Sequence, residues 1–188
     1  MAGEGSPRGD AARHLPLAAL EAGLRALPEA PRDAGSVALL VRRRADGVRE
    51  TPERVRLSAE EGVSGDDWSR RPPRDPAAQL AVMCRDVAQL IANGQPLTLF
   101  GDNLLVELDL SAENLPAGAR LRVGGALVEV TPKPHNGCLK FHGRFGADAH
   151  RLVQAKPTRH RNLRGIYWKV VEPGEVYVGA PIEVLSRS

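Results

Sequence analysis

The stretch around which the chain is organised runs from Ala126 to Gly146 and reads ALVEVTPKPHNGCLKFHGRFG. Its first five residues alternate apolar and polar side chains, which predicts a β-strand. Pro132 and Pro134 end that strand, because a proline cannot donate a hydrogen bond to a neighbouring strand. Asn136 is a preferred helix N-cap residue. The sequence therefore predicts a helix that begins directly after Asn136, with Cys138 at its second position.

A cysteine in the first turn of a helix lies close to free backbone N–H groups and to the positive end of the helix dipole. Such surroundings lower the thiol pKa from its ordinary value of about 8.5. His135, Lys140 and Arg144 are close to Cys138 in the sequence and would add positive potential. The alternative is a buried cysteine that packs as a small apolar side chain. The flanking proline, histidine, asparagine and glycine favour the reactive thiol, since a core cysteine does not need them.

The same stretch is accompanied by three further segments, which occur in a fixed order along the chain. The four segments are GVSGDDW (62–68), LFGDNLLVELDLS (99–111), PKPHNGCLKFHGRFG (132–146) and LRGIYWKVVEPGEVYVGAPIEV (163–184). With them the chain, from about residue 37 to residue 184, resembles stand-alone MOSC domains, a family named after the C-terminal domain of molybdenum cofactor sulfurases. The resemblance implies a β-barrel-like fold. It also implies that Cys138 carries a persulfide sulfur or ligates the molybdenum of a pterin cofactor.

The chain departs from the family pattern at two places. Many members have Gly-Glu-Asn where this sequence has Gly101, Asp102 and Asn103, and many have a histidine shortly after the Gly-Asp pair that is followed here by Trp68. The sequence also lacks the large PLP-binding desulfurase domain of the full sulfurases. If Cys138 carries sulfur, the resemblance therefore implies a separate cysteine desulfurase as partner.

Composition limits the classes of protein to which the chain can belong. Of its 188 residues, 42% are hydrophobic and 4% aromatic, so we expect one core built mainly from Leu, Val and Ala. The formal net charge of +3 does not require a nucleic-acid partner. Two cysteines form no disulfide framework. No apolar run reaches the ~18 residues of a membrane span, and residues 1–13 contain no apolar signal core. We expect a cytoplasmic protein that contacts no membrane.

Short apolar segments separated by glycine and proline turns indicate a mostly β protein with short helices, in agreement with a MOSC-type β-barrel. We divide the chain into a flexible N-terminal segment, residues 1–35, and a MOSC β-barrel domain, residues 36–188. The N-terminal segment contains a predicted helix, Pro16–Leu27, whose leucines recur at helical spacing. That helix could cap an open end of the barrel or form a dimer contact.

The predicted elements of the barrel domain are mostly strands. Alternation and turn signals place the strands at residues 36–43, 54–57, 104–110, 119–123, 126–130, 166–171, 175–178 and 181–185. Residues 54–57 are expected to pair with the first strand, and helices are predicted at 86–92 and 148–154. The apolar run 79–84 fits either a strand or the start of a helix. Cys84, inside that run, is predicted to be a core residue.

A basic segment follows the central stretch. Between residues 140 and 169 there are eight Lys and Arg residues and one acidic residue, a local field that attracts anions. Because the pterin cofactor of the resembled family bears a phosphate, Arg164 is the first candidate for a bidentate phosphate contact. The turn 101–103 could present backbone amides and the Asn103 side chain to an anion. An ordinary Asp–Asn turn is the alternative reading of that segment.

The first functional hypothesis is that the Cys138 thiolate ligates the molybdenum of a pterin cofactor. The resemblance implies that such a protein reduces N-hydroxylated compounds, with a small-molecule substrate and a separate electron donor. The residues expected to bind the cofactor are His135, Asn136, Lys140, Arg144, Asn103 and Arg164.

Three alternatives remain open at this point. Cys138 could carry a persulfide sulfur from the separate desulfurase and transfer it to an acceptor. The basic segment could make the protein a non-catalytic anion- or nucleic-acid-binding module, although the chain contains no nucleic-acid-binding motif and no specific nucleic acid is expected. A zinc ion is a minor alternative, because the spacing of the candidate ligands matches no common zinc pattern. Those candidates are His135, Cys138, His142 and His150.

Overall fold

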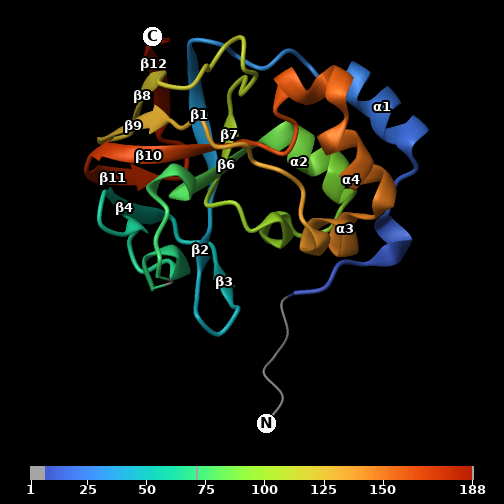
Figure 1. Cartoon of the computed structure of the whole chain (residues 1–188), viewed down its shortest axis with the longest axis horizontal. Coiled ribbons are helices and arrows are strands. Elements are labelled where there is room, and N and C mark those ends of the chain that lie inside the picture. Colours follow the sequence, from blue (N-terminus) through green and yellow to red (C-terminus); the bar gives the residue numbers. More distant parts are fainter. Residues whose placement is uncertain (1–6, 71, 188) are drawn as a thin grey trace.

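A computed structural model describes residues 7–70 and 72–187 of the chain. Within this part, seven strands close a barrel in the order β1-β12-β8-β9-β10-β6-β7 (Figure 1). Their bounds are Ala34–Leu40 (β1), Leu80–Cys84 (β6), Leu104–Glu107 (β7), Arg120–Val123 (β8), Ala126–Val130 (β9), Ile166–Glu172 (β10) and Pro181–Ser186 (β12). The predicted β-barrel with short helices is confirmed.

Two smaller sheets extend the barrel. One has the strand order β11-β4-β5 and the other is the hairpin β2-β3, which projects away from the barrel in Figure 1. The strands are Arg42–Arg43 (β2), Arg49–Glu50 (β3), Arg54–Ser58 (β4), Gly62–Val63 (β5) and Gly174–Tyr177 (β11). The prediction that residues 54–57 pair with the first strand is therefore wrong, because β4 pairs with β11 and β5 instead.

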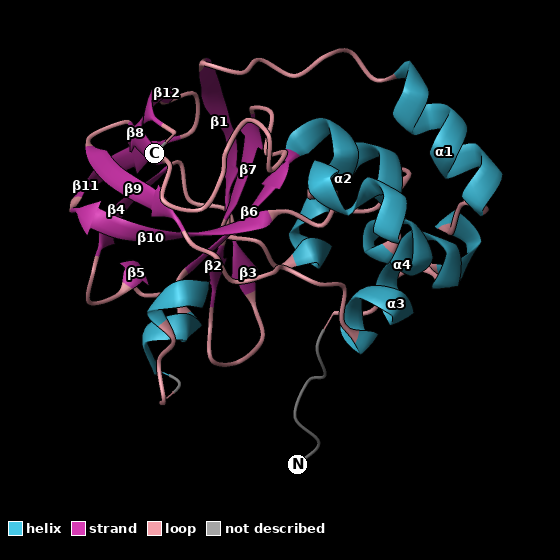
Figure 2. Ribbon diagram, turned by 45° about the horizontal axis from the view of Figure 1, so that its top comes forward, coloured by secondary structure: helices cyan, strands magenta, loops and turns pink. Residues whose placement is uncertain are grey.

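The α-helices gather on one side of the barrel (Figure 2). The α-helices are Leu17–Ala26 (α1), Arg85–Ala92 (α2), Leu139–Phe145 (α3) and Ala147–Gln154 (α4). Short 3-10 turns connect the elements at Ala11–Arg13 (η1), Asp67–Arg70 (η2), Pro76–Ala78 (η3), Leu97–Phe100 (η4) and Lys156–Arg161 (η5). None of the helices within the described residues is long and apolar enough to cross a bilayer.

Strands β6 and β7 separate two apolar cores. Successive side chains of a strand point to opposite faces, so Val82 and Leu104 are buried inside the barrel, whereas Met83 and Leu105 are buried against the helices. The two strands run parallel and are connected through α2. Burial on both faces makes the run 79–84 continuously apolar, which is why periodicity alone could not separate strand from helix.

Helix α1 is present as predicted but does not cap the barrel. Leu20 and Leu24 are buried in the helical core, and α1 contacts α2 and α4. The predicted division after residue 35 falls inside β1. Residues 7–33 are packed onto the rest of the chain: the Asp10 amide, for example, donates to Gln95 Oε1 at 2.7 Å. Residues 1–6 of the predicted flexible segment lie outside the described residues.

Candidate functional site

Cys138 is itself the N-cap residue of α3, with φ −101° and ψ 175°. The His142 amide donates to the Cys138 carbonyl at 3.0 Å, which closes the first helical turn. The prediction that Asn136 caps this helix is therefore wrong by two residues. Gly137 stays outside the helix because its carbonyl accepts a hydrogen bond from Gln154 Nε2 at 2.9 Å and lies 3.1 Å from His150 Nε2.

The surroundings of the Cys138 thiol favour the thiolate. Partial burial opposes ionisation, but the backbone N–H groups of Phe141 and Lys140 and the charge of Arg164 outweigh it, so that the pKa of Cys138 is lowered. This is the effect expected of a sulfur at a helix N-terminus. The residue is exposed, so a partner or ligand can reach it.

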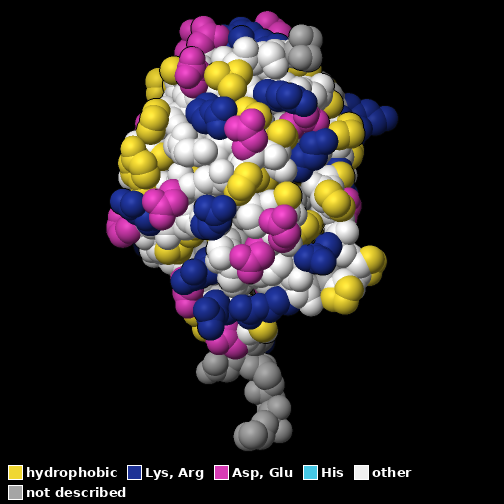
Figure 3. Space-filling view, turned by 90° about the vertical axis from the view of Figure 1, so that its left-hand side faces the viewer, with side chains coloured by type: hydrophobic (Ala, Val, Ile, Leu, Met, Phe, Trp, Pro, Cys, Tyr) yellow, Lys and Arg dark blue, Asp and Glu magenta, His cyan; other side chains and the backbone are white. Residues whose placement is uncertain are grey.

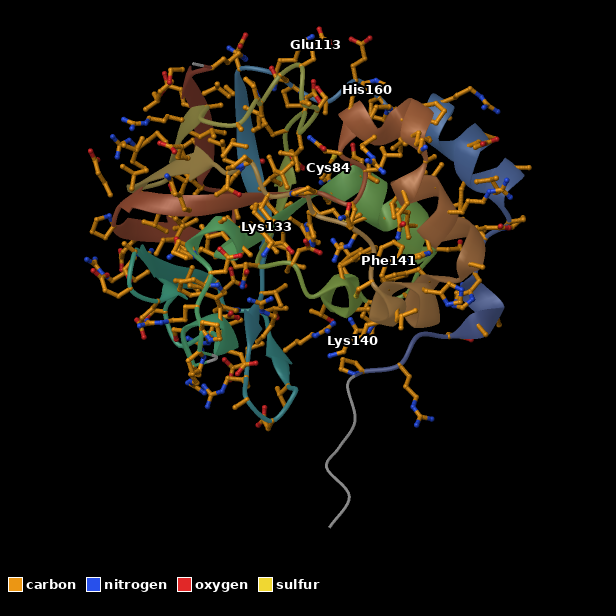
Figure 4. All side chains as sticks on the ribbon, in the orientation of Figure 1. Cys84, Glu113, Lys133, Lys140, Phe141 and His160 are labelled. Atoms are coloured by element: carbon orange, nitrogen blue, oxygen red, sulfur yellow. The ribbon has the colours of Figure 1, made fainter. Side chains whose placement is uncertain are left out.

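Cys138 lines a cavity of about 610 Å³ between the barrel and the helices. Seven of the lining residues are Lys or Arg and three are Asp, so the cavity is basic. The hairpin β2-β3 forms one side of it, and α3 forms another, with Lys140 projecting at the end of that helix in Figure 4. The basic residues are Arg43, Arg44, Arg49, Arg74, Lys140, Arg144 and Arg164.

A buried polar group lies beneath this cavity. Arg164 Nη1 donates to Asp102 Oδ2 at 2.7 Å, and His135 Nδ1 lies 3.6 Å from Asp102 Oδ1. Burial raises the pKa of Asp102 against the opposing effect of Arg164. Burial, followed by the charges of Arg164 and Arg43, lowers the pKa of His135 well below its ordinary value. The histidine is therefore neutral at pH 7, and Asp102 already binds the guanidinium of Arg164.

The hairpin β2-β3 is fixed over the cavity by a second buried carboxylate. Asp66 is 1% exposed and accepts hydrogen bonds from the Arg43 amide at 2.6 Å and from Arg43 Nη2 at 2.6 Å. The charge-assisted bonds with Arg43 offset the burial of Asp66 and lower the pKa of this carboxyl. Asp66 belongs to the segment 62–68 that carried part of the family resemblance, and the structure gives it this anchoring role.

Arg49, on the same hairpin, was missed by the sequence analysis. Its pKa is lowered to about 10, first by burial and then by the positive charges of Arg144 and Arg43. Arg49 donates to the Thr98 carbonyl, and a side chain at Gly101, where φ is +76°, would meet the guanidinium at 3.1 Å. The available sequence signal was the turn Asp46-Gly47 with arginines on both sides, because such a turn folds the two arginine segments against each other.

The structure brings most of the predicted site residues together. His135, Cys138, Lys140, Arg144 and Arg164 all line the cavity. Arg144 is largely buried, and its Nη1 donates to the Leu99 carbonyl at 2.9 Å.

Two predicted site residues do not take the expected place. Asn103 is fully buried: its Nδ2 donates to the Val41 carbonyl at 3.3 Å and its Oδ1 accepts from the Ala81 amide at 3.1 Å. The prediction that its side chain faces an anion is wrong, because both the oxygen and the nitrogen of the side-chain amide form hydrogen bonds with backbone groups of the barrel. Asn136 is exposed and is not among the residues that line the cavity. Over the described ranges, no group of three or more metal-ligating side chains could hold a metal ion, so the zinc alternative gains no support.

The fold and the site define a β-barrel domain with an exposed cysteine of lowered pKa beside a basic cavity. A protein-family model described as "MOSC domain" matches residues 63–183, and the chain belongs to this family. The resemblance found in the sequence is therefore confirmed.

The chain is also similar to individual proteins. Over 88 residues, 47% of this chain, the sequence is 35% identical to the uncharacterized protein YflK of Bacillus subtilis (strain 168). The match covers 37% of YflK, so this chain spans little more than a third of that relative. The crystal structure of the YuaD protein from Bacillus subtilis is 19% identical with a TM-score of 0.55, covering 83% of this chain and 98% of that one. YiiM from Escherichia coli is 23% identical with a TM-score of 0.54, covering 81% and 71%. These two structures show the fold.

Proposed function

We propose that the chain binds a molybdenum-pterin cofactor, with the Cys138 thiolate as the ligand to the metal, and that it reduces N-hydroxylated compounds. The observation that carries the proposal is that a thiol of lowered pKa opens into a cavity lined by seven basic residues. A soft thiolate suits a redox-active metal, and the MOSC family to which the chain belongs is associated with this cofactor.

The cations of the cavity fit an anionic group such as the cofactor phosphate. Burial lowers the pKa of Arg49, and the charges of the nearby Arg144 and Arg43 lower it further. A bound anion would relieve that repulsion and gain charge-assisted hydrogen bonds. Lys140 lies on the same cavity, next to the helix N-terminus. Arg164 is a weaker candidate than the sequence suggested, because Asp102 already pairs with it, and Arg43 is likewise paired with Asp66.

When bound, the cofactor supplies a metal that changes oxidation state by two electrons. That number matches the overall reaction, R–NH–OH + 2 e⁻ + 2 H⁺ → R–NH₂ + H₂O. The protein's own contribution is to hold the metal ligand as a thiolate, bind the phosphate and enclose the substrate. The electrons come from a separate electron-donor protein in this proposal, since the described residues include no redox group of their own besides the two thiols.

The persulfide carrier is the second candidate, and one observation favours it. Cys138 is exposed, and the side chain of Leu139 next to it is 86% exposed. A sulfur that passes between two proteins must be reached by both of them, and an apolar residue beside it offers a contact to a partner.

The nucleic-acid alternative gains no comparable support. Figure 3 shows the barrel face remote from the helices, where Lys and Arg side chains are interspersed with Asp and Glu. Strands β8, β9 and β10 of the barrel carry ion pairs such as Arg120 with Glu129 and Arg122 with Glu172. This face lacks the single-sign field that binding to a phosphate backbone uses.

The proposal is tested by elemental analysis of protein purified from a molybdenum-replete host. We expect near-stoichiometric molybdenum in the wild type and at least a tenfold loss in Cys138→Ser. Cys84→Ser is the matched control and should keep the metal, because the Cys84 thiol does not line this cavity. A Cys138→Ser variant that keeps full molybdenum would overturn the proposal. An intact mass one sulfur atom heavier, reversible by reductant and absent from Cys138→Ser, would establish the persulfide carrier instead.

A further inference from the structure

The cavity beside Cys138 has two chemically different walls. The hairpin β2-β3 and α3 contribute cations, whereas residues 67–78 contribute Asp67, Trp68, Pro73, Arg74, Asp75 and Ala78. Tyr167 of β10 and Phe100 lie on the same cavity, so three of the molecule's few aromatic side chains line it. An anion accounts for the first wall and leaves the aromatic side chain of Trp68 on the second wall without a ligand.

Trp68 is held in place by the same carboxylate that anchors the hairpin. Its amide donates to Asp66 Oδ2 at 3.0 Å, and Ser69 Oγ donates to the Asp66 carbonyl at 3.1 Å. The side chain is only partly buried, unlike Trp168, which is 0% exposed inside the barrel. Trp68 therefore presents indole surface to the cavity from a fixed backbone. A partly exposed tryptophan in a cavity is a stacking platform for flat rings.

A polar ring beside this platform suits a ligand ring that bears nitrogen. The Tyr167 ring packs against the His135 ring, with 4.3 Å between the centroids and 32° between the ring planes. His135 lines the cavity, and its Nδ1 is buried and makes no hydrogen bond within the described structure. The His135 side chain is more than nine-tenths buried, and Asp102 lies beneath it, outside the cavity lining. A polar ring beside an aromatic surface helps to fix the orientation of a bound nitrogen base.

We propose that Trp68 is a specificity-determining residue, which binds the flat face of an aromatic, nitrogen-bearing substrate in this cavity. The inference rests on the proposed function, because it assigns the substrate to the aromatic wall and the cofactor phosphate to the basic wall. A substrate with a saturated ring cannot stack on the indole and binds more weakly.

Calorimetric titration of the full-length protein with two matched probes tests the inference. The probes are N-hydroxybenzamidine and its cyclohexane analogue, which share the same polar group and differ in ring planarity. We expect the wild type to bind the aromatic probe about tenfold more tightly. Trp68→Leu should lose that preference, while Trp68→Phe, which keeps a ring, should retain most of it. Thermal unfolding of each variant confirms that it is folded.

The outcomes separate this inference from the proposed function. Equal affinities in the wild type, no binding of either probe, or a preference that persists in Trp68→Leu would overturn the aromatic site. A protein that shows the Trp68-dependent preference but binds no molybdenum would overturn the cofactor proposal and leave the aromatic site standing. A protein that binds molybdenum but shows the same ring preference with and without Trp68 would overturn the aromatic site and leave the cofactor proposal standing.

Discussion

Cys84 is the N-cap residue of α2, and Cys138 is the N-cap residue of α3. Both have extended backbone angles, and both thiols are approached by N–H groups of the following helical turn. The pKa of Cys84 is nevertheless raised, while that of Cys138 is lowered. Position at a helix N-terminus therefore does not decide thiol ionisation in this chain.

Burial and the sign of the neighbouring charge account for the difference. Burial is the main influence at Cys84, and the carboxylate of Asp86 adds to it against the helix amides and Arg85. At Cys138 the positive charge of Arg164 assists the amides, and together they outweigh burial. A functional thiol thus needs solvent access and a cation in addition to the helix.

The largest expected effect comes from removing the positive charge of Arg164, which lies near Cys138. Arg164→Met leaves Asp102 buried without its guanidinium partner, and we expect the free energy of unfolding to fall by about 3 to 5 kcal/mol. The same change should raise the pKa of Cys138, because Arg164 lowers it in the wild type. Urea unfolding and the pH dependence of thiol alkylation measure the two effects.

Arg54→Met is the matched control for this change. Arg54 pairs with Glu175, but both side chains are 62% exposed, so we expect a loss of at most about 1 kcal/mol and no change at Cys138. A loss in Arg164→Met as small as in the control would show that the buried pair contributes little. An unchanged Cys138 pKa would remove Arg164 from the explanation of the two cysteines.

The next effect compares the two thiols directly. At pH 7 we expect iodoacetamide to label Cys138 at least about tenfold faster than Cys84, because the pKa of Cys138 is lowered, that of Cys84 is raised, and Cys84 is less accessible. Peptide mapping by mass spectrometry after short labelling times gives both rates in one sample. In denaturant the two rates should become equal. A native ratio below about three would contradict the contrast between the sites.

Much of the fold could be predicted from the sequence because it depends on local patterns. The alternation at residues 119–123 and 126–130 places the β8-β9 hairpin correctly, and the helix predicted at 86–92 is α2, which begins one residue earlier and ends at the predicted residue. The pairing partners of the strands were harder to predict from the sequence. The pairing of β4 with β11 joins segments more than a hundred residues apart, and nothing within either segment specifies the other.

The site was predicted in part for the same reason. Cys138, Lys140 and Arg144 are neighbours in the sequence and meet at one cavity. Arg49 reaches that cavity through a tertiary fold-back, and Asn103 is turned into the barrel by two backbone groups that need a partner. The N-cap was misplaced because the Gly137 carbonyl is held by Gln154 of α4. A local capping preference cannot anticipate a bond to a residue 17 positions further along the chain.

The smallest expected effect is the pH dependence of stability that each thiol contributes. The folded pKa of Cys138 is below its unfolded value, so between the two values the unfolded state binds more protons and stability rises with pH. The folded pKa of Cys84 is above its unfolded value, so its contribution is complete at lower pH and is lost as pH rises through the folded value.

The two cysteines should therefore change the slope of the unfolding free energy against pH in opposite directions at mildly alkaline pH. Between pH 7 and pH 10, Cys138→Ser should remove a stabilising trend with pH, and its unfolding free energy should fall more steeply than that of the wild type. Cys84→Ser should remove a destabilising trend and give a shallower fall. Urea titrations at several pH values measure both slopes. If both variants changed the slope in the same direction, the two N-cap thiols would not differ in the sign of their pKa shifts, and the basis for singling out Cys138 would be lost.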